Sequence, residues 1–203
     1  MSNPSPVQLL LASRSPRRAE LLRQIGLRFE IQPADVPEVP GAGQAPGEYA
    51  LATALAKARA VADLRQSNPT LSLPVLGADT DVALDDQILG KPTDRAAALD
   101  MLARLSGRTH QVCSAVAIIH DEGDGARFDT VLSVTQVSFG PISVDEAAAY
   151  WDSGEPADKA GAYAIQGYAA RWVREIHGSY TGVVGLPLYE TVQLLNRFGV
   201  RLP

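Results

Sequence analysis

The side chains that could do chemistry begin with two arginines near the N-terminus. Arg17 and Arg18 follow Ser15 and Pro16, a pair typical of a helix start. A helix N-terminus already carries partial positive charge and prefers acids, by roughly 0.3–1 kcal/mol per charge. Arginines there become favourable if an anion binds. Backbone N–H groups, both guanidinium groups and the hydroxyls of Ser13 and Ser15 would then converge on that anion. The stretch indicates either a phosphate site or a solvated basic turn.

Two lysines could add positive charge around a polyphosphate. Lys91 lies in the turn-like sequence Gly90-Lys91-Pro92. Lys57 lies in an alanine-rich helical segment, where Leu51, Leu55, Ala58 and Ala62 predict the buried side. From this pattern alone, a solvent-exposed position is the simpler interpretation of Lys57.

The acid in the most suggestive position is Asp79. It follows residues 73–78, a nearly all-apolar run typical of a buried central strand, and begins the sequence Asp79-Thr80-Asp81. Open α/β sheets bind ligands at the carboxyl ends of their strands, so we expect Asp79 at such an end. Together with Asp81 or Glu38, it could hold a hard divalent cation such as Mg²⁺ through oxygen ligands.

Cations around a polyphosphate and a carboxylate beside a metal are suited to the attack of water on a phosphoanhydride. The cations neutralise charge, and the carboxylate orients or deprotonates the water. Other constellations are absent from the sequence: it has no Walker-type loop, no dinucleotide fingerprint and no zinc spacing among its histidines.

Alternating strands and helices must position these residues. The strand-like segments are 9–12, 29–32, 73–78, 111–120, 127–137 and 169–176. Helical patterns cover 16–25, 48–66, 94–106 with Thr93 as cap, 143–154 with a capping box, and 187–198. Turns are expected at 85–87, 121–125 and 178–185, and a mobile loop at 33–46 carries Glu38. This order predicts a mixed α/β fold, a twisted sheet flanked by helices.

Composition limits the class of protein. The chain has 203 residues, 46% of them hydrophobic, and a net charge of 18 − 23 = −5, which argues against general nucleic-acid binding. Its one cysteine, Cys113, excludes an intrachain disulfide. We see no secretion signal and no membrane-spanning run, so we expect a cytoplasmic protein with no membrane partner.

Seven short motifs follow one another over nearly the whole chain. They are Ser13–Arg18, Gly77-Ala78-Asp79-Thr80, Gly90-Lys91-Pro92, Leu105-Ser106-Gly107, Asp158–Tyr163, Ile165-Gln166-Gly167 and Val184-Gly185-Leu186-Pro187. In this combination the sequence resembles the Maf family. The resemblance implies a single domain over residues 1–203, related in fold to inosine triphosphate pyrophosphatases, with two lobes around a central cleft. It further implies a metal-dependent (Mg²⁺ or Mn²⁺) nucleoside triphosphate pyrophosphatase that leaves the monophosphate, and suggests a homodimer.

The resemblance also implies roles for individual residues. Asp79 matches the family's proton acceptor, and Glu38 an acid in a flexible loop that could help Asp79 to bind metal. The polar residues that match the lining of the triphosphate pocket are Ser13, Arg17, Arg18, Lys57 and Lys91. Asp81 departs from the family pattern, where apolar residues are usual, and puts a second carboxylate near Asp79.

Three positions match those that separate subgroups of the family. Arg17, Thr80 and Gln166 resemble the dTTP/UTP subgroup, whereas a 7-methyl-GTP subgroup has Trp, Gln and Glu there. Gln166 can donate and accept, as the imide edge of uracil or thymine requires. We expect a dTTP and UTP pyrophosphatase. The alternatives are a 7-methyl-GTP pyrophosphatase and a nucleotide-sensing regulator of cell division without turnover.

Overall fold

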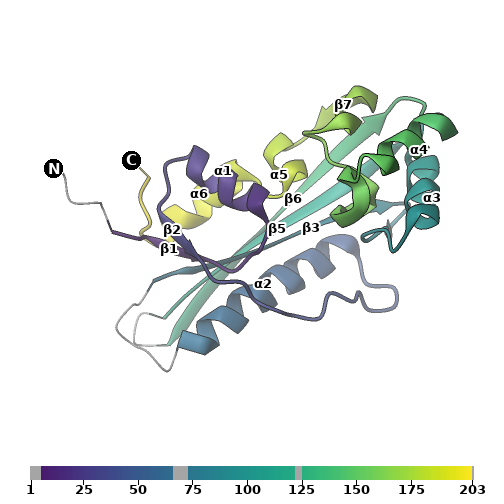
Figure 1. Cartoon of the computed structure of the whole chain (residues 1–203). Coiled ribbons are helices and arrows are strands. Elements are labelled where there is room, and N and C mark those ends of the chain that lie inside the picture. The colour runs from purple at the N-terminus through teal and green to yellow at the C-terminus, as the bar shows by residue number, and fades with distance from the viewer. Residues whose placement is uncertain (1–5, 66–72, 122–124, 203) are drawn as a thin grey trace.

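A single mixed sheet lies at the centre of the computed structural model, which describes residues 6–65, 73–121 and 125–202 (Figure 1). The strands are β1 (Leu9–Leu11), β2 (Phe29–Ile31), β3 (Val75–Leu84), β4 (Gln87–Ile88), β5 (Thr109–Asp121), β6 (Ala126–Phe139) and β7 (Val173–His177). Their order is β2-β1-β3-β5-β6-β7, with β4 paired to β3. Strands β1, β2 and β3 run parallel, and the other pairs antiparallel.

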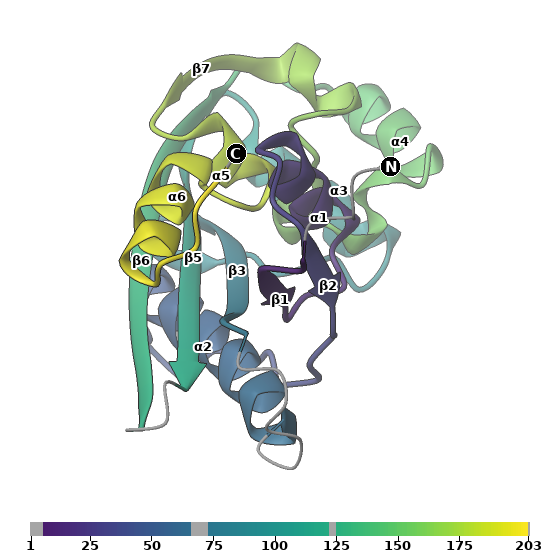
Figure 2. The same ribbon diagram turned by 90° about the vertical axis from the view of Figure 1, so that its left-hand side faces the viewer.

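Helices cover both faces of this sheet, as Figures 1 and 2 show. They are α1 (Pro16–Gln24), α2 (Pro46–Arg65), α3 (Arg95–Leu105), α4 (Val144–Asp152), α5 (Tyr180–Val184) and α6 (Leu188–Arg197), with 3₁₀ helices η1 (Glu155–Asp158), η2 (Ala160–Ala162) and η3 (Tyr168–Trp172). Helix α2 packs on one face, and α1, α5 and α6 on the other. The predicted fold class, a mixed twisted sheet flanked by helices, is confirmed. Within the described ranges, no helix combines the length and apolar character needed to cross a bilayer.

Helix α2 lies unusually close to β3 because small residues face each other. Ala54 and Ala58 are fully buried, and a Cβ added to Gly77 would lie 2.2 Å from the carbonyl oxygen of Ala54. The buried side of α2 includes Ala50 and Val61, and is therefore rotated from the side that the leucines predicted. This rotation turns Lys57 toward the sheet.

The expectation that the strand ends before Asp79 is wrong. Strand β3 continues from Val75 to Leu84, because Val82 and Ala83 keep the pairing with β5. Asp79 is therefore in mid-strand. Successive residues of a strand point to opposite faces, so Asp79 faces α2 while Thr80 faces the other layer.

Strand β1 is much shorter than β3, and this opens one edge of the sheet. The β1 pairing with β3 stops at Leu11 opposite Leu76, and β4 pairs with β3 only from Ala83. Among the described strands, none pairs with the intervening part of β3 on that side. The turn after β1 and the middle of β3 thus border a common space.

Several local predictions need correction. Asp94, rather than Thr93, caps α3, because its side chain accepts from Ala97 N. The segment predicted as strand from 169 begins as η3 and becomes β7 only at Val173. The expected turn at 178–185 contains the short helix α5. The capping box at Ser143 is confirmed. Residues 122–124 of the predicted hairpin turn lie outside the described residues.

His110 on β5 is a buried histidine within an aromatic cluster. Its Nε2 lies 2.8 Å from the hydroxyl of Tyr163, and its ring packs edge-on against Phe139. Burial lowers the pKa of His110 from 6.5 to about 4. The unfolded chain therefore binds more protons than the folded chain between these values, and stability falls as pH falls through this window.

We expect His110→Gln to remove this pH dependence, since glutamine can still bond to Tyr163 but does not titrate. Between pH 6.5 and 4 the wild type should lose about 3 kcal/mol more unfolding free energy than the variant. Urea unfolding across this pH range measures the difference, with His177→Gln as the exposed control. Parallel stability curves for wild type and His110→Gln would contradict the prediction.

Candidate functional site

The open side of β3 leads into a pocket of about 740 Å³. Its lining comes from the turn after β1 and the start of α1, the loop between β2 and α2, Tyr49 and Lys57 of α2, the middle of β3, the segments 88–91 and 158–166, Val112 of β5, and residues 183–185. All of the residues expected in the site line this one pocket. They are Ser13, Arg17, Arg18, Glu38, Lys57, Asp79, Thr80, Asp81, Lys91 and Gln166. A volume of this size accommodates a ligand as large as a nucleotide.

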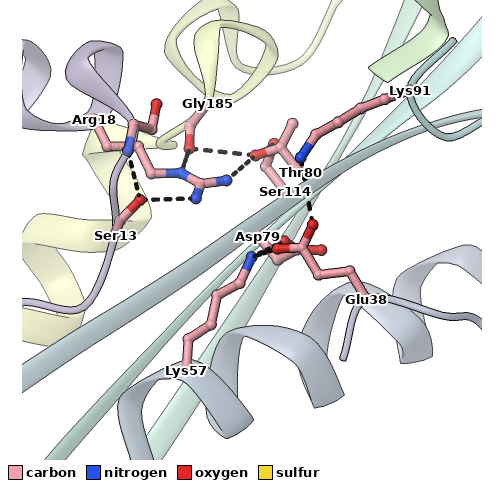
Figure 3. A network of polar contacts seen from close by, with 10 residues as sticks. Ser13, Arg18, Glu38, Lys57, Asp79, Thr80, Lys91, Ser114 and Gly185 are labelled. Atoms are coloured by element: carbon pink, nitrogen blue, oxygen red, sulfur yellow. Dashed lines mark hydrogen bonds and ion pairs between the residues drawn. The ribbon is translucent and has the colours of Figure 1, made fainter. Parts of the chain in front are cut away.

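On the α2 side of β3, lysines and acids alternate in a chain of ion pairs (Figure 3). Lys57 Nζ lies 2.6 Å from Asp79 Oδ1 and 2.6 Å from Glu38 Oε1. Lys91 Nζ lies 3.4 Å from Glu38 Oε2. Lys57 is only 7% exposed, so its interpretation as a solvated surface residue is wrong.

The electrostatics of this chain of ion pairs favour an ionised Glu38. Burial acts to raise the pKa of Glu38, but the hydrogen bond and charge of Lys57, with Lys91 adding to them, hold that pKa below its ordinary value. Glu38 is therefore an anion that already occupies the space between two lysines.

Asp81 extends the acidic group on the same face of β3. Burial, followed by the charge of Asp79 and a hydrogen bond with it, raises the pKa of Asp81 well above its ordinary value. In the absence of a cation, these surroundings favour the protonated form of Asp81. Its Oδ2 is buried without a hydrogen-bond partner among the described residues.

The carboxyl oxygens of these acids fit a divalent cation whose other ligands come from a substrate and from water. The unpartnered oxygen of Asp81 and the carboxylates of Asp79 and Glu38 are hard oxygen donors. Across the described part of the chain, no group of three or more His, Cys, Asp or Glu side chains is arranged to hold a metal. Mg²⁺ commonly uses one or two carboxylates and completes its shell with phosphates and water.

On the opposite side of β3, Arg18 joins the turn after β1 to the end of α5 (Figure 3). Its guanidinium group donates to Ser13 Oγ at 3.1 Å and to the Gly185 carbonyl at 2.9 Å. Ser13 Oγ also accepts from Ser15 N at 3.2 Å, whereas the Ser15 side chain makes no capping bond. Ser13, not Ser15, therefore shapes this turn. Arg18 is 9% exposed, and these contacts hold its guanidinium group in the wall of the pocket.

The hydroxyl of Thr80 is bound within the protein on two sides. It accepts from Arg18 Nη2 and donates to the Gly185 carbonyl, both at 3.2 Å. Ser114 Oγ also lies 3.2 Å from Thr80 Oγ1, but the one hydrogen of the Ser114 hydroxyl goes to the Gly182 carbonyl, which is nearer. Thr80 therefore contributes its small size and its support of Arg18.

Ser114 is a residue of this network that sequence reasoning missed. It lies opposite Thr80 in the β3–β5 register and donates to the Gly182 carbonyl at 2.6 Å. The available signal was a lone hydroxyl within the apolar run from Val112 to Ile119. Buried polar groups need partners, so such a residue indicates a polar contact across layers.

Two further predicted residues line the pocket with more exposed side chains. Arg17, in the first turn of α1, is half-buried, and Gln166, between η2 and η3, is exposed. Both side chains can reach a ligand without breaking a buried network.

A family model described as "Maf-like protein" matches residues 8–198. The chain belongs to the Maf family. The matched range includes the whole lining of the pocket.

Curated Maf relatives carry a common name. A protein named dTTP/UTP pyrophosphatase from Aromatoleum aromaticum is 48% identical, over 98% of this chain and 99% of the relative. Proteins of the same name from Saccharophagus degradans and Alkalilimnicola ehrlichii are 50% and 48% identical, over 95% of this chain and 89% and 93% of their own lengths. A solved structure described as Nucleoside-triphosphatase / dITP/XTP pyrophosphatase from Mycobacterium abscessus matches with a TM-score of 0.43 at 19% identity, over 95% of this chain and 94% of that one. That likeness is too distant to support a conclusion.

Proposed function

We propose that this Maf protein hydrolyses nucleoside triphosphates, with dTTP and UTP preferred, to the nucleoside monophosphate and pyrophosphate. The observation that carries the proposal is the contact between buried Asp79 and Lys57, at 2.6 Å, in a pocket that also holds Lys91 and Arg17. A carboxylate beside cations is what water attack on a phosphoanhydride requires. The names of the relatives describe the same reaction.

In the proposed reaction, Asp79 accepts a proton from a water molecule whose oxygen attacks the α-phosphorus. The bond from that phosphorus to the oxygen bridging to the β-phosphorus breaks, and pyrophosphate leaves. Lys57 contacts the same carboxylate and so orients it. Glu38 bridges Lys57 and Lys91, and its carboxylate occupies the kind of position that a phosphate takes.

A divalent cation, Mg²⁺ or Mn²⁺, fits this proposal. Asp79 and Glu38, with Asp81, are the residues that would hold it. When bound, the cation would supply neutralisation of phosphate charge and a more acidic water. The expectations of a single two-lobed domain, a homodimer and a cytoplasmic location stay predictions.

Base selection is proposed to depend on Gln166. Its amide can donate to a carbonyl of uracil or thymine and accept from the imide N–H, whereas cytosine presents the reversed pattern. Arg17 adds a second polar group to the lining of the pocket. Thr80 acts by its small size and by its hold on Arg18 and Gly185.

The proposed function is tested with dTTP, UTP, CTP, GTP and 7-methyl-GTP, each with Mg²⁺ or Mn²⁺, by assaying both products. We expect monophosphate and pyrophosphate, with the highest kcat/KM for dTTP and UTP. Diphosphate and orthophosphate as products would overturn the reaction. A preference for 7-methyl-GTP would overturn the substrate class, and binding without turnover would favour a regulatory protein.

We expect Gln166→Glu to lower kcat/KM for dTTP and UTP by roughly 10–100-fold. An ionised glutamate only accepts hydrogen bonds and repels the base carbonyl. The effect should be smaller than the 10⁴–10⁵-fold of fully enclosed sites, because Gln166 is exposed. Steady-state kinetics measure it, with Gln193→Glu on the exposed side of α6 as the control. An unchanged ratio of UTP to GTP efficiency would show that Gln166 does not read the base.

A further inference from the structure

The segment that carries Gln166 has little regular structure of its own. It lies between η2 and η3, and one turn hydrogen bond, from Gly167 N to the Ala164 carbonyl at 3.1 Å, spans Gln166. A side chain that reads a base must be held in place, because small displacements of positioning groups cost large factors in rate. The support therefore has to come from outside the segment.

Tyr150, at the end of α4, holds the near side of the segment. Its hydroxyl accepts from Ala164 N at 3.0 Å and donates to Glu155 Oε1 at 2.6 Å. The residue is 3% exposed, and its ring packs edge-on against Trp172 with centroids 5.2 Å apart. The hydroxyl is thus fixed both by its ring packing and by its two hydrogen bonds.

Glu155, in η1, holds the far side. Its Oε1 and Oε2 lie 3.1 and 3.3 Å from Tyr168 N, which donates to them. Together, Tyr150 and Glu155 form a clamp that grips the backbone at Ala164 and at Tyr168. These two points lie two residues before and two residues after Gln166.

Gly167 provides the space that this clamp needs. A Cβ at this position would lie 2.1–2.3 Å from the carboxylate atoms of Glu155. The backbone at Gly167 has a φ of −109°, outside the left-handed region, so its conformation does not itself require glycine. The space for the Glu155 carboxylate does.

We infer that Tyr150 and Glu155 are positioning residues that set the specificity of this Maf protein by fixing the backbone on both sides of Gln166. The inference deepens the proposed function and rests on base reading by Gln166. Neither residue is among the described residues that line the pocket, so they act through the segment and not by touching substrate.

A double-mutant cycle separates this role from general structural support. Tyr150→Phe keeps the ring against Trp172 and removes only the hydroxyl. We expect it to lower kcat/KM for UTP about tenfold or more, and to lower the UTP:GTP efficiency ratio toward that of Gln166→Ala. Adding Tyr150→Phe to Gln166→Ala should then cost little further, because groups that act through one residue are not additive. Tyr189→Phe, on an exposed tyrosine, is the matched control.

Gly167→Ala provides a second test that leaves both clamp side chains in the sequence. The added methyl must displace the end of the Glu155 side chain, so we expect the same loss of selectivity with a folded protein. Full additivity in the cycle, or an unchanged UTP:GTP ratio in both Tyr150→Phe and Gly167→Ala, would overturn the inference. Should Tyr150→Phe fail to fold, Gly167→Ala alone decides.

The same data distinguish this inference from the function on which it rests. If the wild type shows no preference for UTP over GTP, or Gln166→Ala changes nothing, base reading by Gln166 fails. If Gln166→Ala lowers the ratio while the clamp variants keep it, only the clamp fails.

Discussion

Replacing Asp79 by asparagine is expected to lower kcat by about 10²–10⁴-fold, the usual contribution of a general base. An amide cannot accept a proton from water, and it is a poorer ligand for a divalent cation. Asp79 is also the carboxylate to which Lys57 Nζ is bound at 2.6 Å, so the variant loses the orientation that this contact provides. Pyrophosphate release under saturating dTTP with Mg²⁺ measures the change.

The control for this prediction is Asp86→Asn. Asp86 is exposed in the turn between β3 and β4 and has a φ of 61°, a conformation that asparagine tolerates. This variant should keep wild-type kcat, and circular dichroism should show Asp79→Asn folded. An Asp79→Asn enzyme with most of its kcat would remove Asp79 from the mechanism.

Loss of Lys57 is the second large effect that we expect. In Lys57→Ala, the group Glu38, Asp79 and Asp81 is left without its buried cation. Removing one preorganised charge that stabilises a transition state typically costs about 10²–10³-fold in kcat. The burial of Lys57 places it at the upper end of that range, because a buried charge is little screened.

Lys91 provides an internal comparison. Its side chain is 60% exposed and its ion pair with Glu38 is longer, at 3.4 Å, so Lys91→Ala should cost only about three- to tenfold. Arg59→Ala, on an exposed position of α2, should be silent. Kinetics of the three variants with dTTP measure the order. Equal, small losses at Lys57 and Lys91 would contradict the role of the buried ion pair.

The elements that depend on local chemistry could be predicted from the sequence. The capping box at Ser143 and the pairing of β5 with β6 across a short turn are examples, because each is determined by neighbours in the chain. The cap of α3 was misplaced by one residue, since Thr93 and Asp94 are both good caps and only the fold selects between them.

The features that could not be predicted depend on contacts between layers. Leu51 and Leu55 predict the buried side of α2, and this pattern places Lys57 on a solvated face. Gly77 instead permits a close approach between β3 and α2, and the side of α2 that carries Ala54 and Ala58 faces β3. Lys57 lies on this side. Likewise, the sequence predicts a strand that ends before Asp79. The strand continues beyond it because β3 pairs with β5 as far as Ala83.

The alternation of β3 has a consequence for how such a protein can evolve. Asp79 and Thr80 are adjacent in the chain, yet one belongs to the layer with Lys57 and the other to the layer with Arg18 and Gly185. A point mutation in one layer therefore leaves the contacts of the other layer in place. After gene duplication, a copy can therefore change the contacts of the second layer while the ion pairs of the first are inherited unchanged.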